Sequence, residues 1–209
     1  MPAIGILGGT FNPPHAGHVA LARHAREELG LERVWLMPLH TPPHKPAGAD
    51  PGPEHRLAMC RLAVEGEPGI EACGLEVRRA GPSYTADTLS EIHASHPEAE
   101  LTFVMGADTA LTLPGWRDPG RVLALARMAV ARRAGAPPND GAAVLDALAG
   151  IGGVDPRVVF LEMEPIEASS SLARERLAAG VPTDGLLSPQ VRFYIESNAL
   201  YGAVAGASR

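Results

Sequence analysis

The sequence predicts a doubly wound α/β fold, in which helices cover both faces of a mostly parallel sheet. Short apolar runs that are typical of buried strands alternate with segments whose apolar residues recur at helical spacing. Two further helical segments follow the last apolar run, so we also expect C-terminal helices. Parallel strands are joined by helical crossovers, and ligands of such sheets lie where the strands end. We therefore expect functional residues in the turns that follow strands.

The first half of the chain alternates clearly between strands and helices. Apolar runs predict strands at residues 3–7, 33–37 and 70–77. Helical spacing predicts helices at residues 19–29, 54–65 and 85–95. Residues 39–53 form a loop rich in Pro, Gly and His, which is too long for a simple connector and is expected to carry function.

The second half continues this alternation and ends in helices. Strands are predicted at residues 101–105, 128–131 and 158–163, and helices at 121–126, 141–149, 170–179 and 189–198. We expect one domain over residues 1–209, because a chain of 209 residues can bury a sizeable core without disulfides or metal. Residues 200–209 are expected to form a loose tail.

The composition argues against several classes of protein. A dedicated nucleic-acid binder normally carries a basic face, whereas this chain has a net charge of −6 and an isoelectric point near 5.7. No window approaches the roughly 18 uncharged apolar residues of a membrane span, and the first residues lack a secretory signal, so we expect a cytoplasmic protein with no membrane partner. Cys60 and Cys73 lack C-x-x-C spacing and are expected to be reduced thiols.

The string GGTFNPPHAGH, which begins at Gly8 and ends at His18, carries the strongest functional signal. Gly8 and Gly9 allow a sharp turn close to a phosphate, and the start of the following helix favours an anion. His15 and His18 can donate charge-assisted hydrogen bonds to phosphate oxygens, and Gly17 leaves space for the ligand. The string matches neither the P-loop nor the dinucleotide fingerprint, so a P-loop ATPase and a dehydrogenase are unsupported.

Two other interpretations of these histidines remain open. An isolated histidine at a helix start commonly faces solvent or has a partner within the protein. Alternatively, His15 and His18 could bind a metal together with His40 or His44, but no cysteine or suitably placed carboxylate accompanies them. We therefore expect no metal ion bound directly by the protein.

The complete string resembles the signature of the nucleotidyltransferase superfamily that is marked by H-x-G-H. Within that superfamily it is similar to the string of the bacterial nicotinate mononucleotide adenylyltransferases, G-G-[ST]-F-[DN]-P-x-H-x-G-H, and the likeness continues over nearly the whole chain. Asn12 stands where that family more often has Asp, and either residue suits a turn.

Further motifs resemble the family's binding site for the mononucleotide. P-P-H-K ends at His44 and Lys45, and S-Y-T-A-D-T-L contains Tyr84 and Thr85 at a helix start whose N–H groups suit the nicotinate carboxylate. Trp116 stands where the family's tryptophan stacks on the pyridine ring. By themselves, a solvated loop and a core tryptophan would also explain these residues. The mononucleotide site that the resemblance implies comprises Asn12, His44, Lys45, Tyr84, Thr85 and Trp116.

The remaining motifs resemble the family's ATP site. Gly106 and Asp108 form a turn that faces ribose and adenine in the family, although Asp108 could also be a plain helix N-cap. Arg133 resembles an arginine that approaches phosphate. A-S-S-S-L-A-R resembles the superfamily's I-S-S-T-x-I-R, which holds the β- and γ-phosphates. It departs from that motif at Ala168, Ser171, Leu172 and Ala173. The implied ATP site comprises Gly8, Gly9, Thr10, Phe11, His15, Gly17, His18, Gly106, Asp108, Arg133, Ser169, Ser170, Ser171 and Arg174.

The resemblance implies that the phosphate of nicotinate mononucleotide attacks the α-phosphorus of ATP, giving nicotinate adenine dinucleotide and pyrophosphate. His15, His18 and Arg174 are the implied catalytic residues, and Mg²⁺ would be held mainly by substrate phosphates. The expected partners are therefore ATP and nicotinate mononucleotide, and a homo-oligomer stays open. Two rival functions also stay open, namely a phosphopantetheine adenylyltransferase, which lacks P-P-H-K and S-Y-T-x-D-T-L, and a nucleotide sensor without turnover.

Overall fold

A six-stranded sheet forms the centre of the computed structural model, which describes residues 1–42, 49–133, 139–153, 155–164 and 166–203. Every pair of neighbouring strands is parallel, in the order β3-β2-β1-β4-β5-β6, which confirms the predicted doubly wound fold. The strands are β1 (Ala3–Gly9), β2 (Arg33–Pro38), β3 (Ile70–Ala72), β4 (Glu100–Gly106), β5 (Ala126–Arg133) and β6 (Val158–Met163). The order reverses between β1 and β4, so their ends mark the switch point at which ligands of such folds bind.

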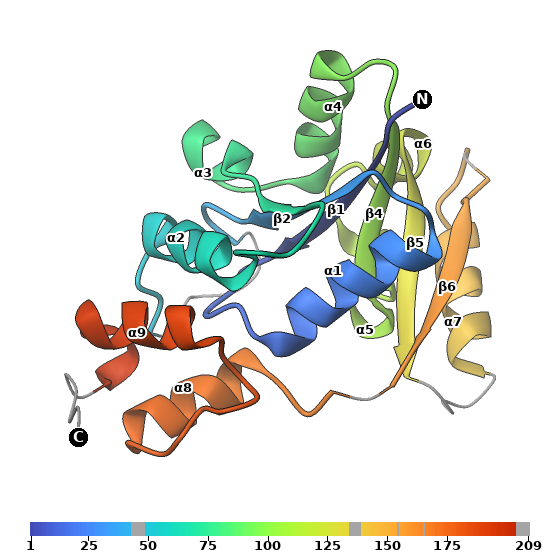
Figure 1. Ribbon diagram of the computed structural model, residues 1–209. Coiled ribbons are helices and arrows are strands. Elements are labelled where there is room, and N and C mark those ends of the chain that lie inside the picture. The colour runs from blue at the N-terminus through green and yellow to red at the C-terminus, as the bar shows by residue number, and fades with distance from the viewer. Residues whose placement is uncertain (43–48, 134–138, 154, 165, 204–209) are drawn as a thin grey trace.

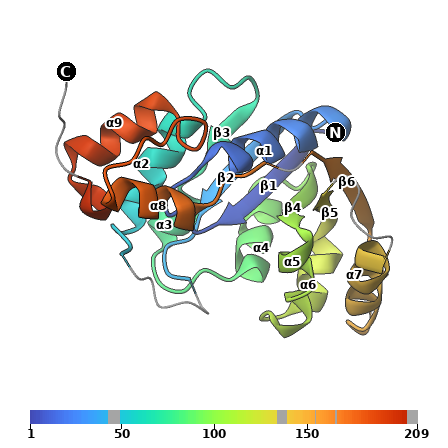
Figure 2. The same ribbon diagram turned by 90° about the horizontal axis from the view of Figure 1, so that it is seen from below.

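Helices lie on both faces of this sheet, as Figures 1 and 2 show. The α-helices are α1 (Ala16–Glu28), α2 (Pro53–Ala63), α3 (Leu75–Arg79), α4 (Thr85–Ser95), α5 (Ala107–Ala110), α6 (Pro119–Leu125), α7 (Asn139–Ala149), α8 (Ser170–Ala178) and α9 (Pro189–Ser197), and the 3₁₀ turns are η1 (Leu113–Gly115) and η2 (Leu200–Gly202). In Figure 2, α1 lies on one side of the sheet, and α4, α6 and α7 lie on the other.

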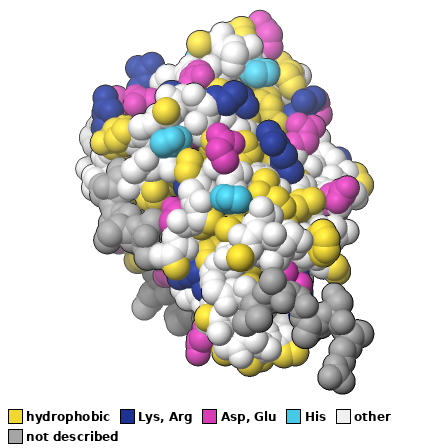
Figure 3. Space-filling model, turned by 90° about the vertical axis from the view of Figure 1, so that its left-hand side faces the viewer, with side chains coloured by type: hydrophobic (Ala, Val, Ile, Leu, Met, Phe, Trp, Pro, Cys, Tyr) yellow, Lys and Arg dark blue, Asp and Glu magenta, His cyan; other side chains and the backbone are white. Residues whose placement is uncertain are grey.

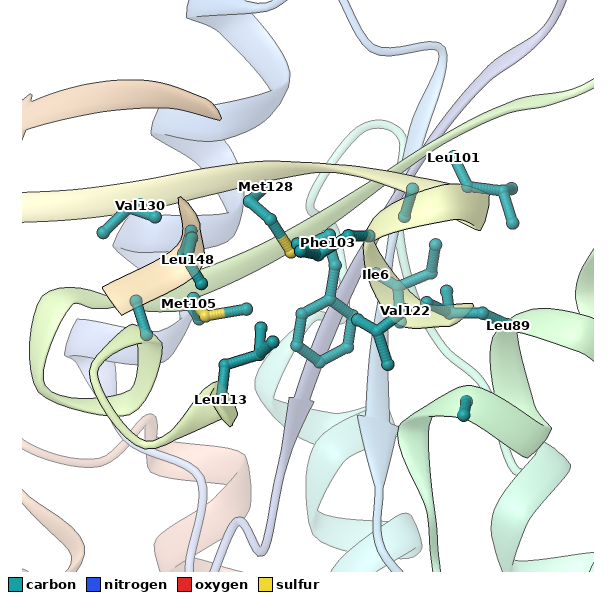
Figure 4. Close-up of a cluster of buried hydrophobic side chains, with 14 of the residues drawn as sticks. Ile6, Leu89, Leu101, Phe103, Met105, Leu113, Val122, Met128, Val130 and Leu148 are labelled. Carbon is teal, nitrogen blue, oxygen red and sulfur yellow. The ribbon is translucent and has the colours of Figure 1, made fainter. Parts of the chain in front are cut away.

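The alternation of side chains along the strands divides the core into two layers. Ile6 of β1 belongs to the cluster under α4, α6 and α7, whereas the next residue, Leu7, belongs to the cluster under α1 and α2. Figure 4 shows the first cluster, with Phe103 between Leu113 and Val122. A strand buried on both faces in this way gives the continuous apolar runs that the sequence contains.

The C-terminal helices pack onto α2 rather than onto the sheet. Met59 of α2 joins residues of α8, α9 and the segment before α9 in a third buried cluster. The adjacent Cys60 turns toward the sheet instead, and its thiol is free. α8 and α9 are thereby held near the end of β1, as Figure 1 shows.

Two predicted segments differ from the structure. The strand predicted at residues 70–77 ends at Ala72, and Leu75–Arg79 is the helix α3. The segment leaves the sheet after Ala72, and the backbone N–H of Arg78 and of Ala80 donate to the carbonyl oxygens of Gly74 and Glu76, as in a helix. The tail predicted from residue 200 is also not loose at its start, because η2 forms and Ala203 is buried in the third cluster.

The surface and the helices add two observations on the environment of the protein. Basic and acidic side chains are interspersed on the face shown in Figure 3. Within the described residues, no helix is both long enough and apolar enough to cross a lipid bilayer.

Candidate active site

The last two residues of β1, Gly8 and Gly9, leave little room for a side chain. A Cβ atom added to Gly8 would lie 3.1 Å from the ring of Phe103, and one added to Gly9 would lie 3.2 Å from the ring of Phe11. Phe11 is itself buried and has a left-handed φ of 50°. The glycines therefore let this phosphate loop, residues 8–15, turn closely over the end of β1.

The C-terminal part of the chain fastens the phosphate loop. Arg174 Nη1 donates a hydrogen bond to the carbonyl oxygen of Asn12 at 2.6 Å, and the hydroxyl of Ser170 donates to that of Pro13 at 2.8 Å. Tyr201 of η2, which the sequence did not single out, donates to Oδ1 of Asn12 at 2.6 Å. Donors from α8 and η2 therefore hold two neighbouring residues of the phosphate loop, Asn12 and Pro13.

Arg56 of α2 is a second anchor that sequence reasoning missed. Its side chain is completely buried, and its guanidinium donates to the carbonyl oxygens of Thr10, Leu39 and His40 at 3.0, 2.6 and 2.9 Å. Asp50 forms a salt bridge with its Nε at 2.9 Å. One cation therefore joins the phosphate loop to the loop that follows β2.

The two histidines of the phosphate loop stand against each other at the start of α1. The ring centroids of His15 and His18 are 3.7 Å apart, and the backbone N–H of His15 donates to Nδ1 of His18 at 3.2 Å. Because Nδ1 accepts, the neutral ring of His18 carries its proton on Nε2. A Cβ atom on Gly17 would lie 3.1 Å from the ring of His15, so the glycine leaves room for this pair.

Burial determines the protonation of these two histidines. Burial lowers the pKa of His15 from 6.5 to about 4 and that of His18 to about 3, and a charge on His15 would lower the pKa of His18 further. Both rings are therefore neutral near pH 7 in the free protein. They are neutral N–H donors, and a bond from either ring to phosphate would be charge-assisted through the anionic oxygen.

The serines at the start of α8 have separate roles in the structure. Ser169 is the N-cap and accepts from the N–H of Leu172 at 3.1 Å, whereas Ser171 accepts from Nη2 of Arg174 at 3.3 Å. Ala173, which replaces a larger apolar residue of the superfamily motif, is fully buried in the third cluster. Helix α8 thus forms with this smaller residue in place.

Two aromatic residues were predicted for the mononucleotide site. Trp116 packs against β4, and Tyr84 lies at the start of α4. Trp116 packs edge-on against Phe103 with centroids 6.1 Å apart, and its Nε1 donates to Oγ1 of Thr112 at 3.0 Å. Tyr84 is the N-cap residue of α4, and the guanidinium of Arg117 lies 4.6 Å from the centroid of its ring. Trp116 is only partly buried, so it is not a plain core tryptophan.

The start of α4 is tied to the loop that follows β2. The backbone N–H of His40 donates to Oγ of Ser83 at 2.9 Å, and the N–H of Ser83 donates to the carbonyl oxygen of Thr41 at 3.1 Å. Thr85, the first residue of α4, therefore lies close to the strand end from which the P-P-H-K motif continues. His44 and Lys45 themselves lie outside the described residues.

The turn after β4 has an open side. Gly106 is the N-cap of α5, and a Cβ atom added to it would meet nothing within 4 Å. Asp108 is exposed in the first turn and makes no capping hydrogen bond, so its interpretation as a helix N-cap is wrong. Arg133 is the last residue of β5, the strand that pairs with β4. These residues thus lie at the same sheet edge as the phosphate loop.

Comparison with known proteins shows the family of the chain. The cytidylyltransferase-like family model matches residues 6–176. The probable nicotinate-nucleotide adenylyltransferase of Gloeobacter violaceus is 38% identical over 207 residues, 98% of each chain. The nicotinate-nucleotide adenylyltransferase of Bacillus subtilis is 35% identical over 201 residues, 96% of this chain and 99% of that one.

A solved structure has the same fold. The nicotinic acid mononucleotide adenylyltransferase of Plasmodium falciparum, complexed with NaAD, superposes with a TM-score of 0.77 at 18% identity, covering 96% of this chain and 98% of that chain. The family model spans most of the chain, and the bacterial relatives match almost end to end. The chain therefore belongs to the cytidylyltransferase-like family and, within it, to the nicotinate-nucleotide adenylyltransferases.

Proposed function

We propose that this protein transfers the adenylyl group of ATP to nicotinate mononucleotide, giving nicotinate adenine dinucleotide and pyrophosphate in NAD biosynthesis. The observation that carries the proposal is the phosphate loop at the switch point, with its paired histidines and its anchors Arg174 and Ser170. The assigned activity of its bacterial relatives supplies the substrates.

The reaction needs positioning and charge stabilisation rather than a base, because the attacking phosphate is already an anion. It displaces pyrophosphate from the α-phosphorus in line. His18 donates its Nε2 proton in a hydrogen bond to an α-phosphate oxygen, since its Nδ1 is occupied by the backbone of His15. His15 donates to the neighbouring phosphates. The negative charge of ATP raises the pKa of both rings and strengthens these bonds.

The leaving pyrophosphate is held by the start of α8. Arg174 keeps its positive charge available there, because no carboxylate among the described residues forms a salt bridge with it. The free N–H groups of the first helical turn, including that of Ser170, and the hydroxyl of Ser171 add to this site. Thr10, Gly106, Asp108 and Arg133 complete the contacts to the nucleotide.

The pyridine end of the mononucleotide binds near α4. Trp116 stacks on the pyridinium ring, and the N–H groups after Tyr84 and Thr85 receive the carboxylate, which distinguishes nicotinate from nicotinamide. His44 and Lys45 complete this end of the site, and Asn12 lies between the two substrates.

A magnesium ion would assist by neutralising charge on the phosphates. Within the described residues, no three His, Cys, Asp or Glu side chains are grouped so that they could hold a metal. Phosphate oxygens and water would therefore supply its ligands. The substrates are water-soluble and both cysteines are free thiols, which fits the cytoplasm as the place of action.

A pyrophosphate-release assay with ATP and Mg²⁺ tests the proposal. Nicotinate mononucleotide, nicotinamide mononucleotide and phosphopantetheine are offered in parallel, and we expect the first to react fastest. Activity with phosphopantetheine alone would refute the proposal and identify a phosphopantetheine adenylyltransferase. Binding of ATP without any release of pyrophosphate would identify a nucleotide sensor.

A further inference from the structure

We propose that Tyr201 is a positioning residue for adenylyl transfer, which acts by holding Asn12 of the phosphate loop through a hydrogen bond from its hydroxyl. The inference rests on the proposed function, since it concerns the same reaction. It assigns a role in that reaction to η2, a short turn after the last α-helix that contributes no other residue to the site described above.

The contact between Tyr201 and Asn12 is short and sheltered. The hydroxyl donates to Oδ1 at 2.6 Å, and Asn12 is only 8% exposed. Burial, reinforced by the charge of Asp50, raises the pKa of Tyr201 well above its usual range, so the hydroxyl remains a donor at neutral pH. An amide oxygen in such a place has little water to replace a lost donor.

The backbone of η2 bends sharply to deliver this side chain. Ala199 has a φ of 49° and Tyr201 a φ of 57°, both in the left-handed region that residues other than glycine seldom adopt. Such conformations persist only when surrounding contacts fix them. Ala203 supplies one such contact in the third cluster, and the bond from Tyr201 to Asn12 supplies another.

The position of Asn12 affects the positions of the two histidines that follow it in the phosphate loop and in α1. Its carbonyl oxygen is held by Arg174 and its side chain by Tyr201, so donors from two C-terminal elements fix one residue. His15 follows three residues later, and His18 lies one helical turn beyond it. A small displacement of Asn12 therefore moves the donors that contact the phosphates, and a misplacement of about 1 Å can lower the rate about 10²-fold.

The chain offers a matched control in Tyr194 of α9. Its hydroxyl also contacts one partner, Nδ1 of His55, at 2.9 Å. Tyr194 and Tyr201 both pack against the third cluster, and replacing either by Phe removes one hydroxyl and nothing else. Of these two hydroxyls, that of Tyr201 contacts the phosphate loop and that of Tyr194 contacts α2.

The test compares Tyr201→Phe and Tyr194→Phe with the wild type in full steady-state kinetics. We expect Tyr201→Phe to lower kcat about 5- to 30-fold, as loss of one buried hydrogen bond allows, and to change KM for nicotinate mononucleotide less than threefold. Tyr194→Phe should stay within twofold of the wild type. In an Asn12→Ala background, Tyr201→Phe should have less than a twofold further effect, because its partner is already gone.

Three outcomes would overturn the inference: unchanged kcat in Tyr201→Phe, an equal loss in Tyr194→Phe, or a full further loss in the Asn12→Ala background. If the wild type releases no pyrophosphate, the proposed function fails, but this inference can still be tested through ATP binding. The rise in melting temperature caused by ATP should then be smaller in Tyr201→Phe than in Tyr194→Phe, and equal rises would refute a positioning role.

Discussion

His15 and His18 lie with their ring centroids 3.7 Å apart and their planes tilted by 31°. A pair this close cannot readily carry two positive charges, and burial disfavours even one. The free protein therefore holds two neutral donors at this position. A bound anionic substrate would raise the pKa of both rings.

Replacing His18 by Ala should lower kcat about 10²- to 10³-fold, as removal of one preorganised oxyanion donor does. His18→Gln, whose amide can donate from near the Nε2 position, should retain more activity than His18→Ala. Pyrophosphate release measures both, and circular dichroism checks that both are folded. Near-normal turnover of a folded His18→Ala variant would refute the role of this residue.

The stability of the protein should fall as the pH decreases from about 6.5 toward 4. The pKa values of His15 and His18 are lower in the folded protein than in the unfolded chain, so the unfolded chain binds more protons in this range. Each histidine contributes up to about 1.4 kcal/mol of lost stability per pH unit.

Urea unfolding at a series of pH values measures this dependence. A His15→Gln, His18→Gln double variant should show a flatter dependence than the wild type over the same range. Parallel curves for the two proteins would mean that these rings are not the groups that titrate.

Arg56→Met should destabilise the fold by about 3 kcal/mol or more, because it leaves Asp50 without its cation and three carbonyl oxygens without their donor. It should also raise KM for both substrates, since Arg56 joins the two loops. Arg61→Met is the matched control, as Arg61 is exposed on the same helix and should change stability by less than about 0.5 kcal/mol. Equal stability of the two variants would contradict the anchoring role.

Trp116→Ala should raise KM for nicotinate mononucleotide about 2- to 30-fold, which corresponds to loss of a cation–π contact, and should affect KM for ATP less. The KM of Trp116→Phe for nicotinate mononucleotide should lie between that of the wild type and that of Trp116→Ala. An equal change in both Michaelis constants would point to a general packing role against Phe103 instead.

The elements that the sequence predicted correctly are those whose signals are local. β1, the glycine turn and α1 follow from residues that are adjacent in the chain, and so does the start of α8 after the serine run. Arg56 could have been found, because it shares the buried side of α2 with Met59 and Cys60 at i+3 and i+4. A charged residue on an apolar stripe indicates a buried partner.

Other features could not be read from the sequence, since they depend on distant segments. Tyr201 lies 189 positions from Asn12, and nothing near either residue indicates the other. The predicted strand was longer than β3 because apolar residues recur as far as Val77, although the segment turns into α3. The neutrality of the histidines depends on burial, which is a property of the packed protein.

The bond between Tyr201 and Asn12 also bears on the order in which the molecule folds. Closing a loop of 189 positions costs chain entropy, which only a largely formed core can offset. We therefore expect the sheet to form first and the phosphate loop to take its final shape last, when η2 docks. A newly made chain would then have a folded sheet before it has an active site that can bind and position its substrates.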